Sequence, residues 1–383
     1  MKEKNSAKIF LPVIFSFFVM GFVDLVGVST GYMKQDFNLS DRMAQFIPFM
    51  VFIWFALLSI PTGIFQDRKG KKTTVNIGLL LSGIGLLIPF LYYSLATALF
   101  GFALLGIGNT ILQVSANPLL IDISSKDSKA ANLSLSQLIK AIASLIGPMV
   151  TVSLALYTGN WKFVLPLFAL VSLISFLWLR NVNIPESKPD KEPATFKSSI
   201  ALLKNPFIAI TILAIFFMVG FDVSINTNIA NFLNVKFDIG LEAASMGIAI
   251  YFFSLMIGRF IGAILLRKID IRLFMIVSTL LALIGLIGML VSTNLMLTRV
   301  LIFVAGIGFS NVFPIMFAII VDRKPEYANE LSGLVILAVS GGAIIPPVIG
   351  VLSDFIGINA VIYVLVFCVL YITYASYYVI KSK

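Results

Sequence analysis

The chain has 383 residues, of which 59% are hydrophobic and only 12% are charged. A soluble globular domain is closer to half apolar and a quarter charged, so most of this apolar surface needs a lipid bilayer as its solvent. The net charge of +10 does not indicate a nucleic-acid partner, because the basic residues lie in short clusters between apolar stretches. The chain has no histidine, which excludes metal sites and proton relays built on histidine.

Twelve apolar stretches are long enough to cross a membrane, since a spanning helix needs about 20 mostly apolar residues. The first follows a short basic N-terminus, and we expect an uncleaved span there, because Asp24 and a glycine-rich stretch follow instead of a small-residue cleavage site. The predicted spans are 9–33, 43–66, 73–94, 97–121, 131–157, 161–179, 206–233, 243–266, 273–292, 296–321, 331–353 and 360–380.

A polar segment with three prolines separates the first six spans from the last six. We therefore predict an N-terminal bundle of residues 1–180, a linker of residues 181–205 and a C-terminal bundle of residues 206–383. If the N-terminus is cytoplasmic, most lysines and arginines between spans fall on the cytoplasmic side, as the positive-inside rule requires. We expect an integral protein of a bacterial inner membrane, with both termini and the linker in the cytoplasm.

The two halves resemble each other at an offset near 200 residues. The correspondences are Gly106-Ile107-Gly108 with Gly306-Ile307-Gly308, Pro148 with Pro346, and Arg68-Lys69 with Arg267-Lys268. Two six-helix halves related by such a repeat are typical of secondary transporters, whose substrate site lies near the membrane midplane between the halves. The predicted fold class is an all-α membrane protein with two pseudo-symmetric six-helix bundles.

The loop after the second span carries a recognisable motif. Residues 63–72 read G-I-F-Q-D-R-K-G-K-K, which resembles the signature loop of the major facilitator superfamily. We expect Gly63 to allow close helix packing. We also expect gating contacts, which form in one conformation and break in the other, from Gly63, Asp67 and Arg68 and from Arg259 of the eighth span.

The motifs of the C-terminal half are more specific than the loop motif. They are G-R-F-I-G at 258–262, N-V-F-P-I-M-F at 311–317 and G-G-A-I-I-P-P at 341–347, and the fourth span adds A-N-P at 116–118. These motifs resemble the fucose–galactose–glucose:proton symporter family, which includes the fucose permeases. The resemblance implies a major facilitator fold and cation-coupled sugar import by alternating access, with a proton as the expected cation.

The sequence departs from that family at the positions expected to handle the proton. The family's carboxylate in span four is replaced by Gln113, and its asparagine in span five is replaced by Lys140. Asp24 is retained in span one. A charge at the bilayer centre costs about 2.5–3.5 kcal/mol, so buried charges there are functional candidates. We therefore predict that Asp24 and Lys140 pair and carry the coupling.

Further polar residues recur at helical spacing within the spans. Stripes of amides and carboxylates suit a polyhydroxylated ligand, which needs many donors and acceptors, although the same residues can also bind helices to one another. Glycines such as Gly27 and Gly31, spaced by four, indicate close helix packing or a sliding surface. The predicted substrate-binding residues are Asp24, Gln113, Asn117, Gln137, Lys140, Asp222, Asn226 and Asn311.

The leading hypothesis is a secondary transporter that imports a neutral hexose or deoxyhexose by cation symport. Its expected partners are the sugar, a coupling cation and the lipid bilayer, and we expect a monomer without cofactor or metal, and not an enzyme. Two alternatives stay within transport: a facilitator for another solute, including an anionic one bound through Lys140, and a sodium-coupled sugar transporter. A membrane sensor or enzyme would need a soluble domain or a nucleophile–base pair, and the sequence offers neither.

Overall fold

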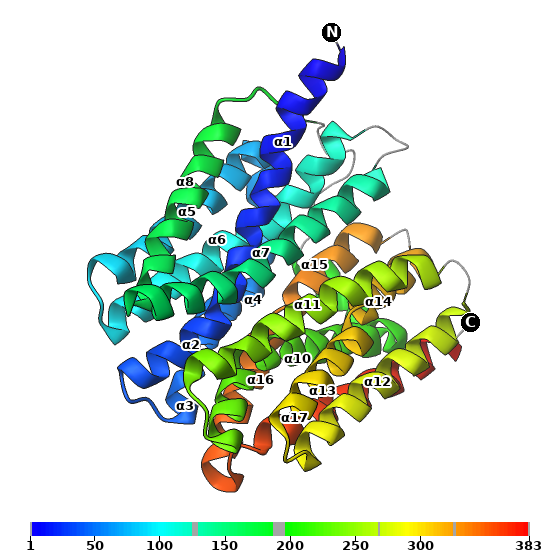
Figure 1. Ribbon diagram of the computed structural model, residues 1–383. Helices are drawn as coiled ribbons and strands as arrows, with labels where there is room; N and C mark the ends of the chain where they lie inside the picture. The colour runs from blue at the N-terminus through cyan, green and yellow to red at the C-terminus, as the bar shows by residue number, and fades with distance from the viewer. Residues whose placement is uncertain (1, 125–128, 187–195, 267–268, 325–326, 382–383) are drawn as a thin grey trace. The chain divides into compact units, whose positions relative to one another are not determined.

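The computed structural model describes residues 2–124, 129–186, 196–266, 269–324 and 327–381, and these residues form helices joined by short turns (Figure 1). Within them, twelve helices are long and apolar enough to cross a membrane. They coincide with the twelve predicted spans, and their ends extend further in places: the first runs over Lys8–Asp36 and the seventh over Pro206–Phe237. The predicted all-α, twelve-span fold is confirmed. Arg267 and Lys268 of the repeat, and part of the linker, lie outside the described residues.

Contacts group the chain into two compact units, and the border between them falls inside the first two spans. Unit 1 contains Met1–Leu25 and Ile53–Thr195, and unit 2 contains Val26–Phe52 and Phe196–Lys383. Residues 26–52 therefore group with the C-terminal part of the chain. The division into bundles of residues 1–180 and 206–383, which the sequence repeat suggests, stays a prediction. The contacts describe how the segments cluster in this conformation.

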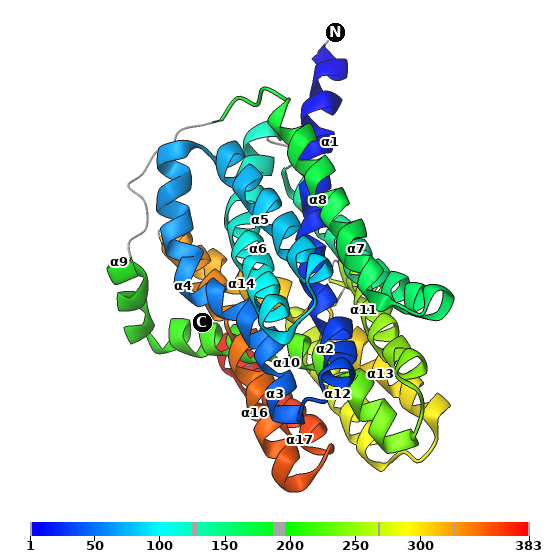
Figure 2. The same ribbon diagram turned by 90° about the vertical axis from the view of Figure 1, so that its left-hand side faces the viewer.

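Unit 1 is a bundle built around three neighbouring helices. Helix α5 (Lys71–Leu91) packs against α6 (Leu95–Ile123) and α8 (Val164–Arg180), and the three lie side by side in Figure 2. Helix α1 (Lys2–Met20) packs against α6, α7 (Lys129–Thr158) and α8. The unit also contains the 3₁₀ turns η1 (Gly21–Asp24) and η2 (Trp161–Phe163), and the larger part of α4 (Phe46–Lys69).

Unit 2 is organised around α10 (Pro206–Phe237), which packs against five other α-helices of the unit. Its neighbours are α11 (Leu241–Leu265), α14 (Val312–Arg323), α15 (Ala328–Ala338), α16 (Gly341–Ile356) and α17 (Ala360–Lys381). Helix α12 (Ile271–Val291) packs against α13 (Leu295–Phe309) and α17. The unit is completed by α2 (Leu25–Asp36), α3 (Asp41–Ala44), α9 (Phe196–Ala201) and η3 (Leu202–Lys204).

Glycines that correspond in the sequence repeat make equivalent helix contacts in the two units. A Cβ added at Gly85 of α5 would lie 2.6 Å from the backbone oxygen of Gly101 in α6, and one added at Gly285 of α12 would lie 2.7 Å from that of Leu301 in α13. Small residues allow membrane helices to approach this closely. The same correspondence holds for Gly108 against Gly78 and Gly308 against Ser278. The α5–α6 pair of unit 1 thus has the same contact geometry as the α12–α13 pair of unit 2.

Candidate transport site and gating residues

The first span changes from α-helical to 3₁₀ geometry at η1, and Asp24 is the last residue of this break. Short 3₁₀ segments inside a helix often mark functional hinges. Gly21 permits the break to lie directly against α7, because an added Cβ would come within 2.6 Å of Ala143 Cβ. Asn109 of α6 donates its Nδ2 hydrogen to the Met20 carbonyl at 2.6 Å, so a second helix holds the other side of the break.

Asp24 is half-buried and accepts a hydrogen bond from α7. The Ser144 Oγ hydroxyl lies 2.5 Å from Asp24 Oδ2 and 3.0 Å from the Lys140 carbonyl oxygen one turn earlier. The backbone of Lys140 is therefore adjacent to the Asp24 carboxylate. Ser144 of α7 is one partner of Asp24. The ion pair between Asp24 and the Lys140 ammonium stays a prediction.

Three amide side chains form a ladder along α6, as their spacing of four residues predicts. Gln113 Nε2 donates to Asn109 Oδ1 at 2.9 Å, and Asn117 Nδ2 lies 3.5 Å from the Gln113 carbonyl oxygen. Asn109 is fully buried and uses both ends of its amide on protein partners. Asn117 Oδ1 is buried and has no hydrogen-bond partner among the described residues. The ladder thus ends in a buried acceptor without a partner among the described residues.

A second carboxylate, Asp222, lies on α10 in unit 2. The hydroxyl of Tyr251 in α11 donates to Asp222 Oδ1 at 2.6 Å, and the tyrosine side chain is fully buried. A buried tyrosine normally needs a partner for its hydroxyl, and Asp222 provides one here. Asn226 follows Asp222 by one helical turn and is buried as well.

Asn311 lies in the break between α13 and α14, and its amide ties this break to α11. The Nδ2 group donates to the Gly258 carbonyl at 2.7 Å and to Ser310 Oγ at 2.9 Å. Both donor hydrogens are therefore used within the protein, one of them on a neighbouring helix and the other inside the break. Gly262 lies directly beneath this amide, where an added Cβ would overlap it. Polar residues in spans either bind a ligand or bind helices to one another. In this conformation the Asn311 amide binds helices.

The predicted substrate residues divide between the two units. Within unit 1 the structure brings Asp24 close to α7 at Lys140, and it aligns Gln113 with Asn117, whereas the side chain of Gln137 is exposed. Asp222, Asn226 and Asn311 belong to unit 2. One site built from both sets stays a prediction.

The signature loop is held by residues that the motif does not include. Lys71 Nζ forms an ion pair with Asp122 Oδ2 at 2.6 Å, and the two side chains are only 15% and 6% exposed. The Glu186 carboxylate accepts hydrogen bonds from the backbone nitrogens of Lys71 at 2.5 Å and Lys72 at 3.1 Å. These are free N–H groups at the N-terminus of α5, where the helix dipole also favours a negative charge.

Sequence reasoning missed Asp122, which directly follows the fourth predicted span, and Glu186, which lies in the predicted linker. Gly70, which precedes α5, has φ +90°, a conformation that glycine adopts without strain. The close packing expected at Gly63 is wrong: an added Cβ would meet none of the described atoms within 4 Å. Asp67 and Arg259 are half-buried and Arg68 is exposed, and the gating roles of all four residues stay predictions.

Comparison with known proteins places this architecture in a family. The sequence profile of the Major Facilitator Superfamily matches residues 12–347. A glucose/galactose transporter of Brucella abortus biovar 1 (strain 9-941) is 26% identical over 397 residues, covering 100% of this chain and 96% of that protein. The glucose/mannose transporter GlcP of Bacillus subtilis (strain 168) is 23% identical over 352 residues, covering 87% and 85%.

The fold comparison agrees. The crystal structure of a variant of the E. coli fucose:proton symporter FucP superimposes with a TM-score of 0.67 at 18% sequence identity, covering 97% of this chain and 98% of that one. Identity at this level shows a common fold and nothing about substrate. Together with the twelve spans, the repeated glycine contacts and a profile match over most of the sequence, these similarities show that the chain belongs to the Major Facilitator Superfamily.

Proposed function

We propose that this chain imports a small neutral sugar, a hexose or a deoxyhexose, by proton symport through alternating access. The observation that carries the proposal is the amide ladder of α6, which lies beside the break that holds Asp24. Amides donate and accept at once, as sugar hydroxyl groups do. The buried and unpaired Asn117 Oδ1 supports a ligand there, because a buried acceptor without a partner costs about 1–3 kcal/mol.

The names of the relatives support the same class of substrate. The two curated relatives are called glucose/galactose and glucose/mannose transporters, and the solved structure is called a fucose:proton symporter. In this proposal Asp24, Gln113, Asn117, Gln137, Lys140, Asp222 and Asn226 bind the sugar. Asn311 ties its helix break to α11 instead, and Gly63, Asp67, Arg68 and Arg259 act in gating.

The coupling step is assigned to Asp24. A carboxylate at a helix break inside a span can carry a proton, and the chain has no histidine that could do so instead. Ionised Asp24 next to the Lys140 ammonium would be a neutral pair, which lets the empty carrier return across the membrane. Protonated Asp24 would release Lys140 and accompany the sugar.

A sodium-coupled mechanism is the second candidate, and one observation favours it. The Asp24 carboxylate and the Ser144 hydroxyl place oxygen atoms of two helical segments side by side, and a hard cation would bind both oxygen atoms in place of the hydrogen bond between them. A gradient of sodium in place of the proton gradient distinguishes the two mechanisms.

The substrate class is tested by counterflow in proteoliposomes. Vesicles containing purified protein are loaded with unlabelled D-galactose and diluted into radiolabelled D-galactose, and competitors are added outside. Neutral hexoses and L-fucose should compete, and galacturonate and uridine should not. Stronger competition by galacturonate than by any neutral hexose would instead assign an anionic substrate to Lys140.

A further inference from the structure

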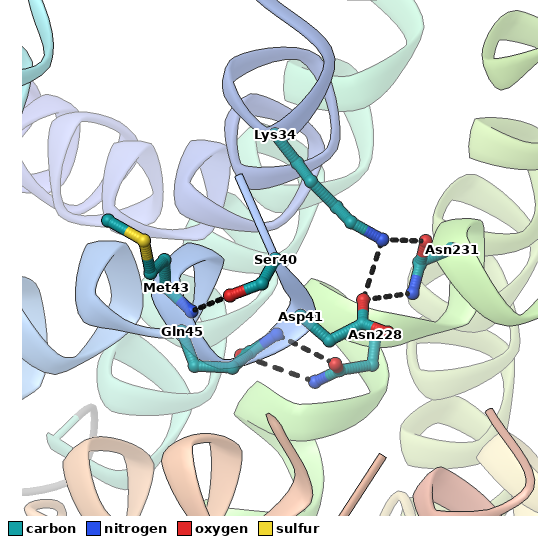
Figure 3. Close-up of polar contacts among 7 residues, drawn as sticks. All are labelled: Lys34, Ser40, Asp41, Met43, Gln45, Asn228 and Asn231. Carbon is teal, nitrogen blue, oxygen red and sulfur yellow. Dashed lines mark hydrogen bonds and ion pairs between the residues drawn. The ribbon is translucent and has the colours of Figure 1, made fainter. Parts of the chain in front are cut away.

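A closed triangle of hydrogen bonds fastens the end of the first span to α10 (Figure 3). Lys34 Nζ donates to Asp41 Oδ1 at 2.6 Å and to Asn231 Oδ1 at 2.7 Å, and Asn231 Nδ2 donates to Asp41 Oδ1 at 2.8 Å. The three residues are the outer cluster, since the proposed topology places this end of the span outside the cell. Each member binds the other two, so the loss of one leaves two partners incomplete.

A buried pair of amides reinforces the outer cluster one turn away. Gln45 Nε2 donates to Asn228 Oδ1 at 2.8 Å, and the two side chains are 3% and 3% exposed. Ser40 caps α3 by accepting a hydrogen bond from the Met43 nitrogen at 3.2 Å, which positions Asp41 and the following Gln45 (Figure 3). All of these residues belong to unit 2.

Glycines allow residues 26–52 to dock this closely. An added Cβ would overlap Asn226 of α10 at Gly27, and at Gly31 it would come within 3.1 Å of Leu241 Cδ1. Gly27, Gly31 and Lys34 lie on one face of α2, because their spacing is that of successive helical turns. The packing role of this glycine pair is therefore to seat α2 on unit 2.

A cavity of about 290 Å³ adjoins the outer cluster within unit 2. Its polar lining consists of Lys34, Gln35, Asn38, Asn231 and Asn234. At ~30 Å³ per water molecule the volume corresponds to about ten waters, enough for a monosaccharide. Lys34 is neutralised by Asp41, so the lining offers amide donors and acceptors without a net charge, and this chemistry favours a neutral solute over an anion.

We propose that this cavity is an outer docking site for a neutral polyhydroxylated solute, whose hydroxyl groups compete for the hydrogen bonds of the outer cluster. A hydroxyl both donates and accepts, so it can replace either the Asn231 amide or the Asp41 carboxylate as partner of Lys34. Exchange of one such hydrogen bond for another has a small net free energy, so a docked solute loosens the attachment of α2 to α10. The solute class rests on the proposed function.

Protection from alkylation tests the site. In a Cys368→Ala background, Gln35→Cys places a reporter in the cavity and Arg42→Cys places one on the same surface outside the cavity; Gln35 and Arg42 are both exposed. The rate of reaction with a membrane-impermeant maleimide is measured with and without D-galactose, and glycine betaine serves as the solute without hydroxyls. D-galactose should slow the reaction at Gln35→Cys by at least about threefold and leave Arg42→Cys unchanged.

Two further variants locate the bound sugar. Asn38→Gly removes a cavity amide at a position with φ +50°, which glycine tolerates, and it should abolish the protection. Gln113→Ala removes an amide of the α6 ladder and should leave the protection intact. Loss of protection in Gln113→Ala would show that the sugar acts from the ladder and would overturn the outer site.

The remaining outcomes separate this inference from the proposed function. Counterflow of D-galactose without protection at Gln35→Cys overturns the outer site and leaves the function standing. Protection without counterflow of any hexose supports the site and overturns sugar transport. The absence of both overturns both.

Discussion

The Ser144 hydroxyl donates a hydrogen bond to the Asp24 carboxylate across 2.5 Å and so joins α7 to the break in the first span. A hydrogen bond to a charged group is worth about 1.5–3 kcal/mol, and its loss leaves a carboxylate incompletely paired inside a span. Ser144→Ala should therefore lower the melting temperature of the purified protein and impair gradient-driven uptake. The matched control is Ser153→Ala, since Ser153 Oγ donates only to the Met149 carbonyl of its own helix. Equal effects of the two changes would remove Ser144 from the site.

The α6 ladder leads to a prediction about affinity. Gln113→Ala and Asn117→Ala should each weaken binding of the transported hexose by about 1–3 kcal/mol, because a buried sugar hydroxyl loses its partner. Calorimetric titration of the purified protein measures this.

Asn311→Ala is the contrast, since both donors of Asn311 are used on Gly258 and Ser310. It should lower the melting temperature and leave the affinity within about twofold of wild type. If Asn311→Ala weakened hexose binding and the two ladder variants lowered only the melting temperature, Asn311 would belong to the substrate site and the ladder would have a packing role.

The Lys71–Asp122 ion pair should be important for stability because its side chains are nearly buried. Removal of one partner from a buried pair typically costs about 3–5 kcal/mol, because the other charge stays buried and unpaired. Asp122→Leu should therefore lower the melting temperature strongly, and Lys71→Met combined with Asp122→Leu should recover much of the loss. An exposed carboxylate, Asp354, supplies the control Asp354→Asn, which should be neutral. A double variant less stable than Asp122→Leu would contradict the account.

The orientation in the membrane is tested by single cysteines in a Cys368→Ala background. Asn183 lies in the predicted cytoplasmic linker and Tyr157 at the predicted outer end of the fifth span, and both are exposed. In intact cells an impermeant maleimide should label Tyr157→Cys, and it should label Asn183→Cys only after the membrane is permeabilised. Labelling of Asn183→Cys in intact cells would invert the topology and place the outer cluster on the cytoplasmic side.

The sequence was sufficient for the spans and the repeat, because both are local signals. Apolar length alone locates a span. Gly108 and Gly308 correspond to each other in the sequence repeat, and they also make equivalent helix contacts in the structure. The α6 ladder was predictable for the same reason, since a spacing of four residues fixes one helix face.

The partners of charged groups were not predictable, because they depend on which distant helices meet. Nothing local links Lys71 with Asp122 or Asp222 with Tyr251. Hydropathy also does not predict 3₁₀ geometry at η1, since Gly21, Phe22 and Val23 continue the apolar run and a charged residue such as Asp24 does not by itself break a helix. The grouping of residues 26–52 with unit 2 belongs to one conformation of the chain, and a transporter sequence encodes more than one.

In the proposed mechanism Asp24 couples a proton gradient to sugar uptake, and uptake by reconstituted protein measures this coupling. Wild-type protein and the Asp24→Asn variant are reconstituted in proteoliposomes, and D-galactose accumulation is followed under an imposed pH gradient, acidic outside, and separately under a sodium gradient. Wild type should accumulate the sugar only with the pH gradient, and Asp24→Asn should lose accumulation but retain exchange. Undiminished accumulation by Asp24→Asn, or accumulation driven by sodium alone, would contradict it.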